Sequence, residues 1–356
     1  MDPLAHTLLG ATLAESGLKR RSRYATATLL IGANLPDIDA VANFWGADMA
    51  LHARRGVTHG VLAMVALPLL LAAAVWLWHR WRGSTAPAAD APRFRPRAIV
   101  GLAFLGVLSH PALDWLNTYG VRLLMPFDGR WFYGDTLFII DPWFWLLAAA
   151  GVVLARSGSA RAVAGWLVLA AAATWLVITT EVVGPGVKIG WIAGIAAIAA
   201  LRWRFPVAAA QEAFPRASLA TLALYVGLAF GYARFAESAL AEQFAAARAV
   251  QANPVPGVPW AHRVVVVETD TYRIVTGEGA VFTVPRREPD AIVKAALQQE
   301  SVRGFATWMR YPHWSVEERP ERWIVRFQDL RYQGPDVPNP RGIGFAQAEV
   351  PKAVPR

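Results

Sequence analysis

The chain has 356 residues, of which 55% are apolar and 17% charged, and its net charge is +9. Soluble domains carry about 25% charged residues, so this composition favours a protein embedded in lipid. The arginines gather beside apolar segments, as membrane orientation requires, and we therefore expect no nucleic-acid partner. The absence of cysteine excludes disulfides and thiolate metal ligands. Asp2 and His6 stand where a cleavable signal peptide would carry basic residues, so we expect the N-terminus to be retained.

Apolar segments divide the first two thirds of the chain. A membrane-spanning helix needs about 20 mostly apolar residues. Two shorter apolar stretches, which either re-enter the membrane or pack against the bundle, come first: 4–17 and 24–36. Longer stretches follow, and we expect spanning helices at 61–78, 98–118, 142–156, 162–181 and 217–235, with 187–203 nearly as apolar. The sequence therefore predicts a mainly α fold, with a polytopic transmembrane helix bundle over residues 1–235.

Basic residues in short loops mark the cytoplasmic side of a membrane protein. Four alternate loops are rich in lysine and arginine: 19–23, 80–97, 156–161 and 202–216. With these loops in the cytoplasm, the segments on the opposite face are 37–60, 119–141, 182–187 and everything after 235. The chain is thus predicted to be a multi-pass membrane protein. Some arginines depart from the pattern and should serve another purpose: Arg54, Arg55, Arg122 and Arg130.

The last third of the chain has a more ordinary composition and is predicted to be a small α+β domain outside the membrane, on the non-cytoplasmic side. An amphipathic helix (236–252) and a hinge rich in proline should lead into it, together covering 236–259. Within 260–335 we expect strands at 262–268, 272–275, 280–284 and 323–327, and a helix at 288–300. Residues 336–356, rich in proline and glycine, are predicted to be a disordered tail.

Histidines and aspartates recur at the predicted non-cytoplasmic ends of the first segments. His110 and Asp114 are four residues apart and therefore project from one face of a helix. Asp37 and Asp39 would project to one side of an extended segment. Imidazole and carboxylate suit Zn²⁺, Mn²⁺ or Fe²⁺, and a ligand set without thiolate is compatible with a catalytic ion. We predict a divalent metal site, preferably for zinc, with the ligands His6, His52, His59, His110 and Asp114.

These residues also have structural alternatives. His6 can be a hydrogen-bonded packing residue, and His110 with Asp114 can form a buried ion pair within one helix. Asp37 and Asp39 can cap the next helix, because aspartate is a favoured N-cap residue. None of these alternatives explains why four histidines and several aspartates converge on one face, which favours the metal site.

Several ordered motifs make the chain similar to a known family. They are residues 1–10 (MDPLAHTLLG), 33–39 (ANLPDID), 54–60 (RRGVTHG), 110–120 (HPALDWLNTYG) and the segment 131–143. Together they resemble the YdjM-like family of bacterial inner-membrane proteins, which are described as metal-dependent hydrolases. The resemblance implies functional roles for His6, Asp37, Asp39, His52, His59, His110 and Asp114. Gly60 departs from the family, which often has serine there.

The residues and the resemblance together predict a membrane hydrolase that acts on an ester or phosphoester of a lipid-like substrate. Asp37 or Asp39 would serve as general base, and Arg54 with Arg55 would bind the anionic group bidentately. The two arginines could instead anchor lipid headgroups. Two other functions use the same residues: an ion or solute transporter, and a non-catalytic membrane protein with a structural metal. The lipid bilayer is the expected partner in all three cases.

Overall fold

A computed structural model describes the chain except for residues 83–91, 208–210, 277–278, 335–339, 341 and 353–356. The chain divides into two compact units. The first unit comprises Met1–Ile38, Val57–Gly231 and Pro256–Pro259, and the second comprises Asp39–Gly56, Tyr232–Val255 and Trp260–Arg356.

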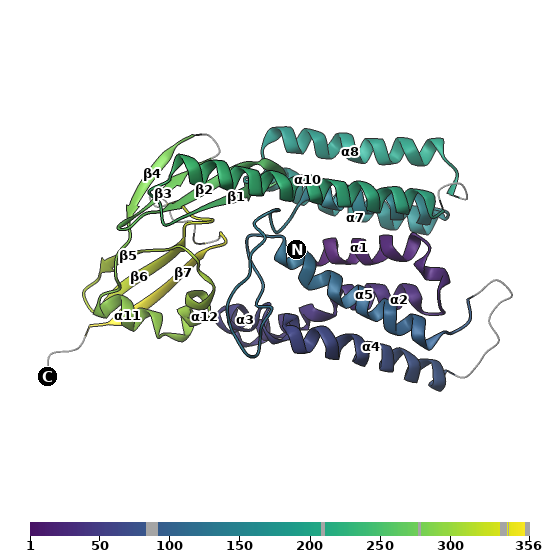
Figure 1. Cartoon of the computed structure of the whole chain (residues 1–356), viewed down its shortest axis with the longest axis horizontal. Helices are drawn as coiled ribbons and strands as arrows, with labels where there is room; N and C mark the ends of the chain where they lie inside the picture. Colours follow the sequence, from purple (N-terminus) through teal and green to yellow (C-terminus); the bar gives the residue numbers. More distant parts are fainter. Residues whose placement is uncertain (83–91, 208–210, 277–278, 335–339, 341, 353–356) are drawn as a thin grey trace. The chain divides into compact units, whose positions relative to one another are not determined.

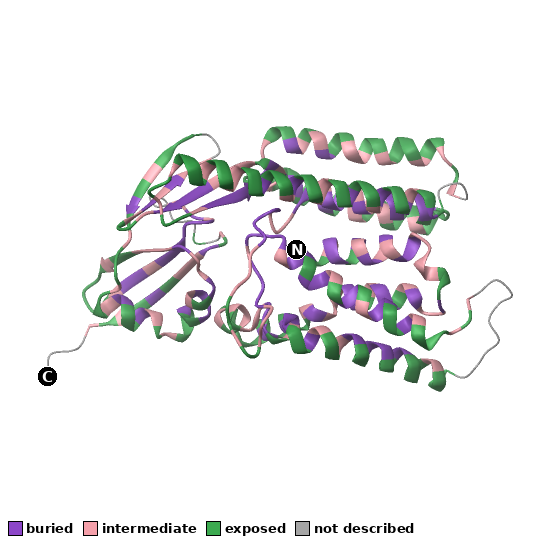
Figure 2. Cartoon of the chain, viewed as in Figure 1, coloured by how far each residue is buried: buried purple, intermediate pink, exposed green. Residues whose placement is uncertain are grey.

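The first unit is a bundle of helices that run side by side (Figure 1). They are α1 (Pro3–Glu15), α2 (Ala25–Asn34), α4 (Val61–Trp81), α5 (Pro96–Trp115), α6 (Pro142–Arg156), α7 (Ala160–Thr179), α8 (Pro185–Arg204) and α10 (Ala213–Gln243), of which the part up to Gly231 belongs to this unit. Within the described residues, five of these are long and apolar enough to cross a membrane: α4, α5, α7, α8 and α10. Much of their apolar surface is exposed, as on α8 in Figure 2, which suits contact with lipid. The predicted polytopic helix bundle is confirmed.

Two of the predicted apolar segments differ from expectation in whether they are long enough to span the membrane. Residues 142–156 form α6, which has only 15 residues and is therefore shorter than a full span. Residues 187–203, predicted as nearly apolar enough, lie in α8, whose 20 residues meet the length and hydropathy of a span. Helix α6 begins at Pro142, directly after its N-cap Asp141. With a capped proline at its first position, the helix does not extend into the preceding loop.

The basic loops meet at one end of the bundle. The carboxylate of Glu15, the last residue of α1, pairs with Lys19 of the following loop and with Arg156, the last residue of α6, each at 2.6 Å. Other contacts join the remaining loops: Arg20 and Arg216 to Glu212, the Arg216 guanidinium to Ser16 O (2.9 Å), and Arg23 N to Arg93 O (3.2 Å). These contacts bring together the four loops that the charge pattern assigns to the cytoplasm.

Small residues let α2 approach α1 and α5 closely. A Cβ built on Gly32 would lie 3.2 Å from the Gly106 Cα of α5, and one on Gly10 would lie 3.0 Å from Leu29 O. Membrane helices use small residues in this way because close backbone contact replaces the missing hydrophobic drive between helices. The packing fixes the end of α2 against α5, one turn before His110.

The second unit contains two antiparallel sheets (Figure 1). The first sheet has the order β1-β2-β3-β4, with β1 at Ala249–Val255, β2 at Val258–Val267, β3 at Thr271–Val275 and β4 at Val281–Pro285. The second has the order β5-β6-β7, with β5 at Pro312–Glu318, β6 at Arg322–Asp329 and β7 at Phe345–Pro351. Helices α11 (Ala291–Leu297) and α12 (Glu300–Trp308) connect the two sheets. Val265, Ile274 and Leu330 belong to its buried core.

Helix α12 packs against α3 (Ala47–Ala53), which belongs to the same unit. The contact is close at Gly304, whose amide donates to the Asp48 carboxylate. A Cβ at Gly304 would lie 2.2 Å from Asp48 O, so only glycine fits there.

Two predicted segments differ from the observed elements. No separate helix covers 236–252, because α10 continues to Gln243 and strand β1 begins at Ala249. The predicted hinge is a turn between β1 and β2, with Gly257 at φ +70°. In the tail predicted to be disordered, Phe345–Pro351 forms β7, since it finds a complete antiparallel partner in β6. The remainder of that prediction, at 336–339, 341 and 353–356, lies outside the described residues.

Candidate metal centre

Helix α1 is fixed at its start by its own N-cap. The Asp2 carboxylate accepts from Leu4 N at 3.0 Å and Ala5 N at 3.1 Å, and Pro3 occupies the first turn. Aspartate followed by proline is a strong helix start, because the cap uses amides that lack partners within the helix. The Trp145 indole of α6 donates to Asp2 Oδ2 at 3.0 Å. This arrangement holds His6, one turn later, in the interior of the bundle.

His110 and Asp114 project from the last turns of α5, and both are fully buried. His110 Nδ1 lies 2.6 Å from Ala33 O at the end of α2, so this ring nitrogen carries the proton and donates to the carbonyl. His110 Nε2 is thereby left as the lone-pair nitrogen. Metal-bound histidines commonly have a carbonyl or carboxylate at their other ring nitrogen, which fixes the ring and its tautomer.

His59 and Asp37 come from two 3₁₀ helices, η3 (Val57–His59) and η2 (Leu35–Trp45). The His59 Nδ1 lies 2.9 Å from the Thr58 hydroxyl oxygen, which can accept its proton as Ala33 O does for His110. Gly60, next to His59, approaches the Met125 carbonyl so closely that a Cβ would lie 2.1 Å from its oxygen. The serine that the family often carries at this position therefore does not fit here without a shift of the backbone.

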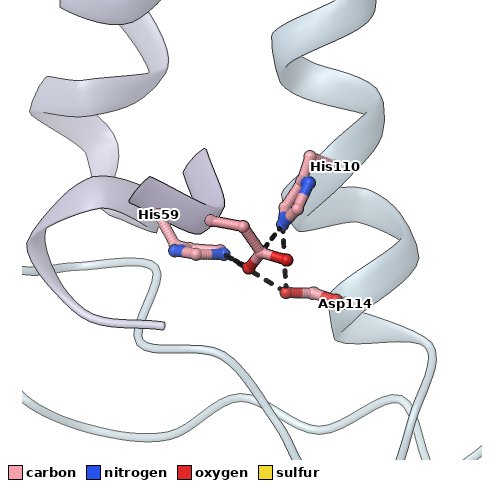
Figure 3. A group of neighbouring side chains, drawn as sticks. His59, His110 and Asp114 are labelled. Atoms are coloured by element: carbon pink, nitrogen blue, oxygen red, sulfur yellow. Dashed lines mark ion pairs between the residues drawn. The ribbon is translucent and has the colours of Figure 1, made fainter. Parts of the chain in front are cut away.

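Four side chains bring one ligand atom each to a common point: Asp37, His59, His110 and Asp114. Figure 3 shows His59, His110 and Asp114 pointing toward one another from η3 and α5. His59 Nε2 lies 3.2 Å from Asp114 Oδ2 and 3.8 Å from Asp37 Oδ1. His110 Nε2 lies 3.3 Å from Asp37 Oδ1 and 3.5 Å from Asp114 Oδ2.

These separations fit the coordination shell of a small divalent ion. Ligands about 2.0–2.1 Å from one tetrahedral Zn²⁺ are separated from each other by roughly 3.3 Å. The four nitrogen–oxygen separations of 3.2–3.8 Å surround that value. Two imidazoles and two carboxylates, without sulfur, are ligands that zinc, manganese and iron all accept. The residues present therefore fit a divalent metal.

Burial strengthens the same conclusion. The side chains of His59, His110 and Asp114 have no solvent exposure, and that of Asp37 is 12% exposed. Two carboxylates this close and this buried are costly unless a positive charge compensates them. A divalent cation would supply such charge, in addition to the Met1 amino group that contacts Asp114.

His6 lies beside the four-residue group, on the other oxygen of Asp114. His6 Nε2 is 3.2 Å from Asp114 Oδ1, and its ring stacks on that of His110 with centroids 3.7 Å apart. The amino nitrogen of Met1 also contacts Asp114 Oδ1. In this position His6 orients the Asp114 carboxylate.

The other predicted site residues lie in the second unit. His52 is in α3 and is not part of the four-residue group. Helix α3 ends at Ala53 and Arg55 has φ +51°, so no continuous helix joins His52 to His59. The prediction of a shared side for Asp37 and Asp39 is also wrong, because η2 is a 3₁₀ helix, in which residues two apart point about 240° from each other.

Asp39 instead holds the two arginines that were predicted to bind an anion. Its Oδ1 pairs with Arg54 Nη1 and its Oδ2 accepts from Arg55 N, both at 2.8 Å. Both Asp39 and Arg55 are buried. The carboxylate thus fixes the backbone and one guanidinium of the Arg54-Arg55 pair.

The two remaining arginines that depart from the charge pattern also have local partners. Arg130 pairs with Asp128 at 2.6 Å, and its backbone amide and guanidinium hold the pKa of Asp128 below its usual value. Arg122 is buried, with its guanidinium 4.9 Å from the centre of the Trp131 ring. Pairing and stacking account for these basic residues, as expected of side chains that do not set topology.

Sequence reasoning missed two partners that orient the ligand rings, Thr58 and the carbonyl of Ala33. The Thr58 hydroxyl directly precedes His59 and could have been noticed from the motif. The Ala33 carbonyl could not, because a backbone oxygen carries no sequence signal and its position depends on the close packing of α2 on α5.

Comparison with known proteins places these residues in a family. Residues 1–183, which include all four ligand residues, match the family model described as YdjM inner membrane protein. The protein YfhP of Bacillus subtilis (strain 168), described as uncharacterized, is 22% identical over 333 residues. That match covers 93% of this chain and 80% of the relative. No solved structure matches the chain.

Proposed function

The chain belongs to the YdjM inner membrane protein family, and from this premise we propose that it is a membrane-embedded, metal-dependent hydrolase. The observation that carries the proposal is the convergence of Asp37, His59, His110 and Asp114 on one buried point. The proposed substrate is an ester or phosphoester of a lipid-like molecule, cleaved at the non-cytoplasmic face of the membrane.

The chemistry follows from the ligand set. His59, His110 and Asp114 would hold a divalent ion, which would supply Lewis acidity and lower the pKa of a bound water to about 7. His59 and His110 hold the ion through Nε2, while Thr58 and the Ala33 carbonyl keep both rings in the required tautomer. For Asp37, the second carboxylate of the group, we propose the role of general base, which would accept the proton of the attacking water.

The anionic part of the substrate is proposed to bind Arg54 and Arg55. Arginine donates two parallel hydrogen bonds to a phosphate or carboxylate, which gives orientation as well as charge. Asp39, predicted as a general base, already accepts from both residues, so we assign it a positioning role for the pair.

A lipid substrate is supported by η2, in which one apolar face is exposed and Asp39 lies on the buried face. Residues three apart share a face in a 3₁₀ helix. One face carries Ile38, Val41 and Phe44, which are exposed by 57%, 50% and 88%. The residues of the buried face are Pro36, Asp39 and Ala42. A connection between two bundle helices that turns its apolar face outward is suited to lie in the bilayer surface, where lipid headgroups are found.

Elemental analysis of the detergent-purified protein tests the proposal. Wild type should contain about one equivalent of zinc, manganese or iron per chain, while His110→Ala and Asp114→Asn should lose it. His79→Ala is the matched control, since His79 lies at the opposite end of α4 and stacks on Phe94 with centroids 4.0 Å apart. A wild type that takes up no metal after reloading would refute the metal site.

Turnover separates catalysis from a structural metal. Metal-loaded wild type should hydrolyse a fluorogenic phospholipid or phosphodiester in mixed micelles, and activity should follow metal content across the variants. A protein that binds metal stoichiometrically but hydrolyses no lipid ester or phosphoester would refute the hydrolase and leave the structural alternative.

A further inference from the structure

A cavity of about 440 Å³ lies within the helical unit, between α1, α6, α7 and α8. Its lining is almost entirely apolar except at one end, where Arg202 and Ser157 lie. Arg202 donates from Nε to Ser157 Oγ at 2.7 Å and from Nη2 to Ser157 O at 3.2 Å. Two tryptophans, Trp166 and Trp203, line the cavity together with them. The cavity therefore has one polar, basic end and an apolar body.

The length of the cavity matches one leaflet of a bilayer. Lining residues extend over 145–157 at α6, 163–173 on α7 and 191–203 on α8. At 1.5 Å per residue, these helical stretches are about 18, 15 and 18 Å long. Half of a hydrocarbon core of about 30 Å is about 15 Å. Three helices thus line the cavity over the depth that a lipid chain occupies in one leaflet.

The polar end coincides with the basic end of the bundle. Ser157 directly follows Arg156, the last residue of α6, which pairs with Glu15. Arginine has five N–H donors on its three guanidinium nitrogens. The contacts of Arg202 to Ser157 and to Phe205 O use one N–H donor of each nitrogen. Each terminal nitrogen therefore keeps one donor, the arrangement that binds a phosphate bidentately.

From this geometry we propose that the cavity binds one acyl chain of a phospholipid of the leaflet next to the basic loops, with the lipid phosphate on Arg202. The chain lies against the apolar walls of α6, α7 and α8. Tryptophans near the headgroup end fit this placement, because indole rings concentrate at the membrane–water interface.

The bound chain would also contact the helix that carries His6. Leu4 and Leu8 of α1 line the cavity, and His6, two residues from each, points to the opposite side because successive residues turn by about 100°. Trp145 lines the cavity as well and donates to the Asp2 cap of α1. The lipid is thus a packing partner of α1 and is distinct from the substrate of the metal centre.

Native mass spectrometry of detergent-exchanged protein titrated with phosphatidylglycerol tests the proposal. Wild type should bind one lipid tightly. Ala170→Trp fills the cavity, and Arg202→Gln removes the side chain that binds the phosphate. Each variant should weaken lipid binding about tenfold or more, which for Arg202→Gln is the effect of losing a hydrogen bond to a charged group. Ala172→Trp and Arg204→Gln are matched controls on the same helices, exposed and outside the cavity lining, and should bind as wild type does.

Palmitic acid and inorganic phosphate serve as separate probes, and neither alone should match phosphatidylglycerol. Equal affinity of Ala170→Trp and Ala172→Trp would overturn the proposal, as would equal losses in Arg202→Gln and Arg204→Gln. Metal content and the unfolding temperature of each variant show that it is folded. Because this experiment reads lipid binding alone, its failure leaves the proposed hydrolase untouched, and the reverse also holds.

Discussion

The contact between Thr58 Oγ1 and His59 Nδ1 allows a sharp test of the metal centre. Thr58→Val keeps the shape of the side chain but removes the hydroxyl that lies 2.9 Å from the ring nitrogen. His59 has no solvent exposure, so bulk water does not reach the ring to replace the hydroxyl. Loss of such an outer partner lowers metal affinity about 10–100-fold, or about 1.4–2.7 kcal/mol. We expect a loss in this range with little change in fold.

The measurement is competition for Zn²⁺ between the protein and a chromogenic chelator in detergent. Thr58→Ser restores the hydroxyl and should recover most of the affinity. The reasoning is refuted if Thr58→Val binds zinc as tightly as wild type. It is equally refuted if Thr58→Ser loses as much as Thr58→Val, because the effect would then arise from packing and not from the hydrogen bond.

Three further predictions concern packing, membrane contact and pH. Gly106→Ala would place a Cβ 3.1 Å from a backbone oxygen of α2, so it should destabilise the bundle by about 1–3 kcal/mol, seen as a lower unfolding temperature in detergent. Because the chain has no cysteine, a nitroxide attached to a single introduced cysteine can report membrane depth. In liposomes, nitroxides at Val41→Cys and Phe44→Cys should be accessible to oxygen, and a nitroxide at Asn43→Cys should be accessible to an aqueous nickel complex. Equal access of the nickel complex to all three positions would contradict an interfacial η2. Burial lowers the pKa of His262 below its usual 6.5, so the stability it contributes is present above pH 6.5 and is lost as the pH falls through the folded-state pKa. His262→Phe should flatten the decrease in unfolding temperature between pH 7.5 and 5, and an unchanged decrease would exclude this residue as its source.

The helical unit was largely predictable because the lipid environment imposes length and apolarity on each span. The same signal locates α4, α5, α7 and α8 to within a few residues of their observed ends. The same signal failed at the end of the last span, because the length of the helix there depends on local helix propensity. The residues after the last span, such as Ala239, Leu240 and Glu242, are good helix formers, so α10 continues without a break to Gln243. Strand β7 was missed because its order depends on pairing with β6, a contact that the composition of a tail does not reveal.

The metal centre was predictable only where its ligands share one element. The spacing of His110 and Asp114 on α5 gave a correct local geometry, since helical periodicity is regular. The spacing of His52 and His59 does not define their relative position, because Arg55 turns the chain between them. The meeting of Asp37 with His110 depends on the approach of α2 to α5, which is set by glycines whose role appears only in the packed structure.

The distances within the cluster favour the proposed metal centre over an ordinary buried ion pair. Two imidazolium rings would balance two carboxylates as well as one divalent cation does, so charge alone does not decide. A charge-assisted N–H···O bond, however, has a length of about 2.7–2.9 Å. All four separations between the imidazole Nε2 atoms and the facing oxygens of Asp37 and Asp114 are longer, at 3.2–3.8 Å. They are close to the roughly 3.3 Å between ligands that share one zinc ion, while the opposite nitrogens of both rings already have partners. The cluster is therefore arranged to face a common centre, which supports the proposed metal ion over a set of pairwise hydrogen bonds.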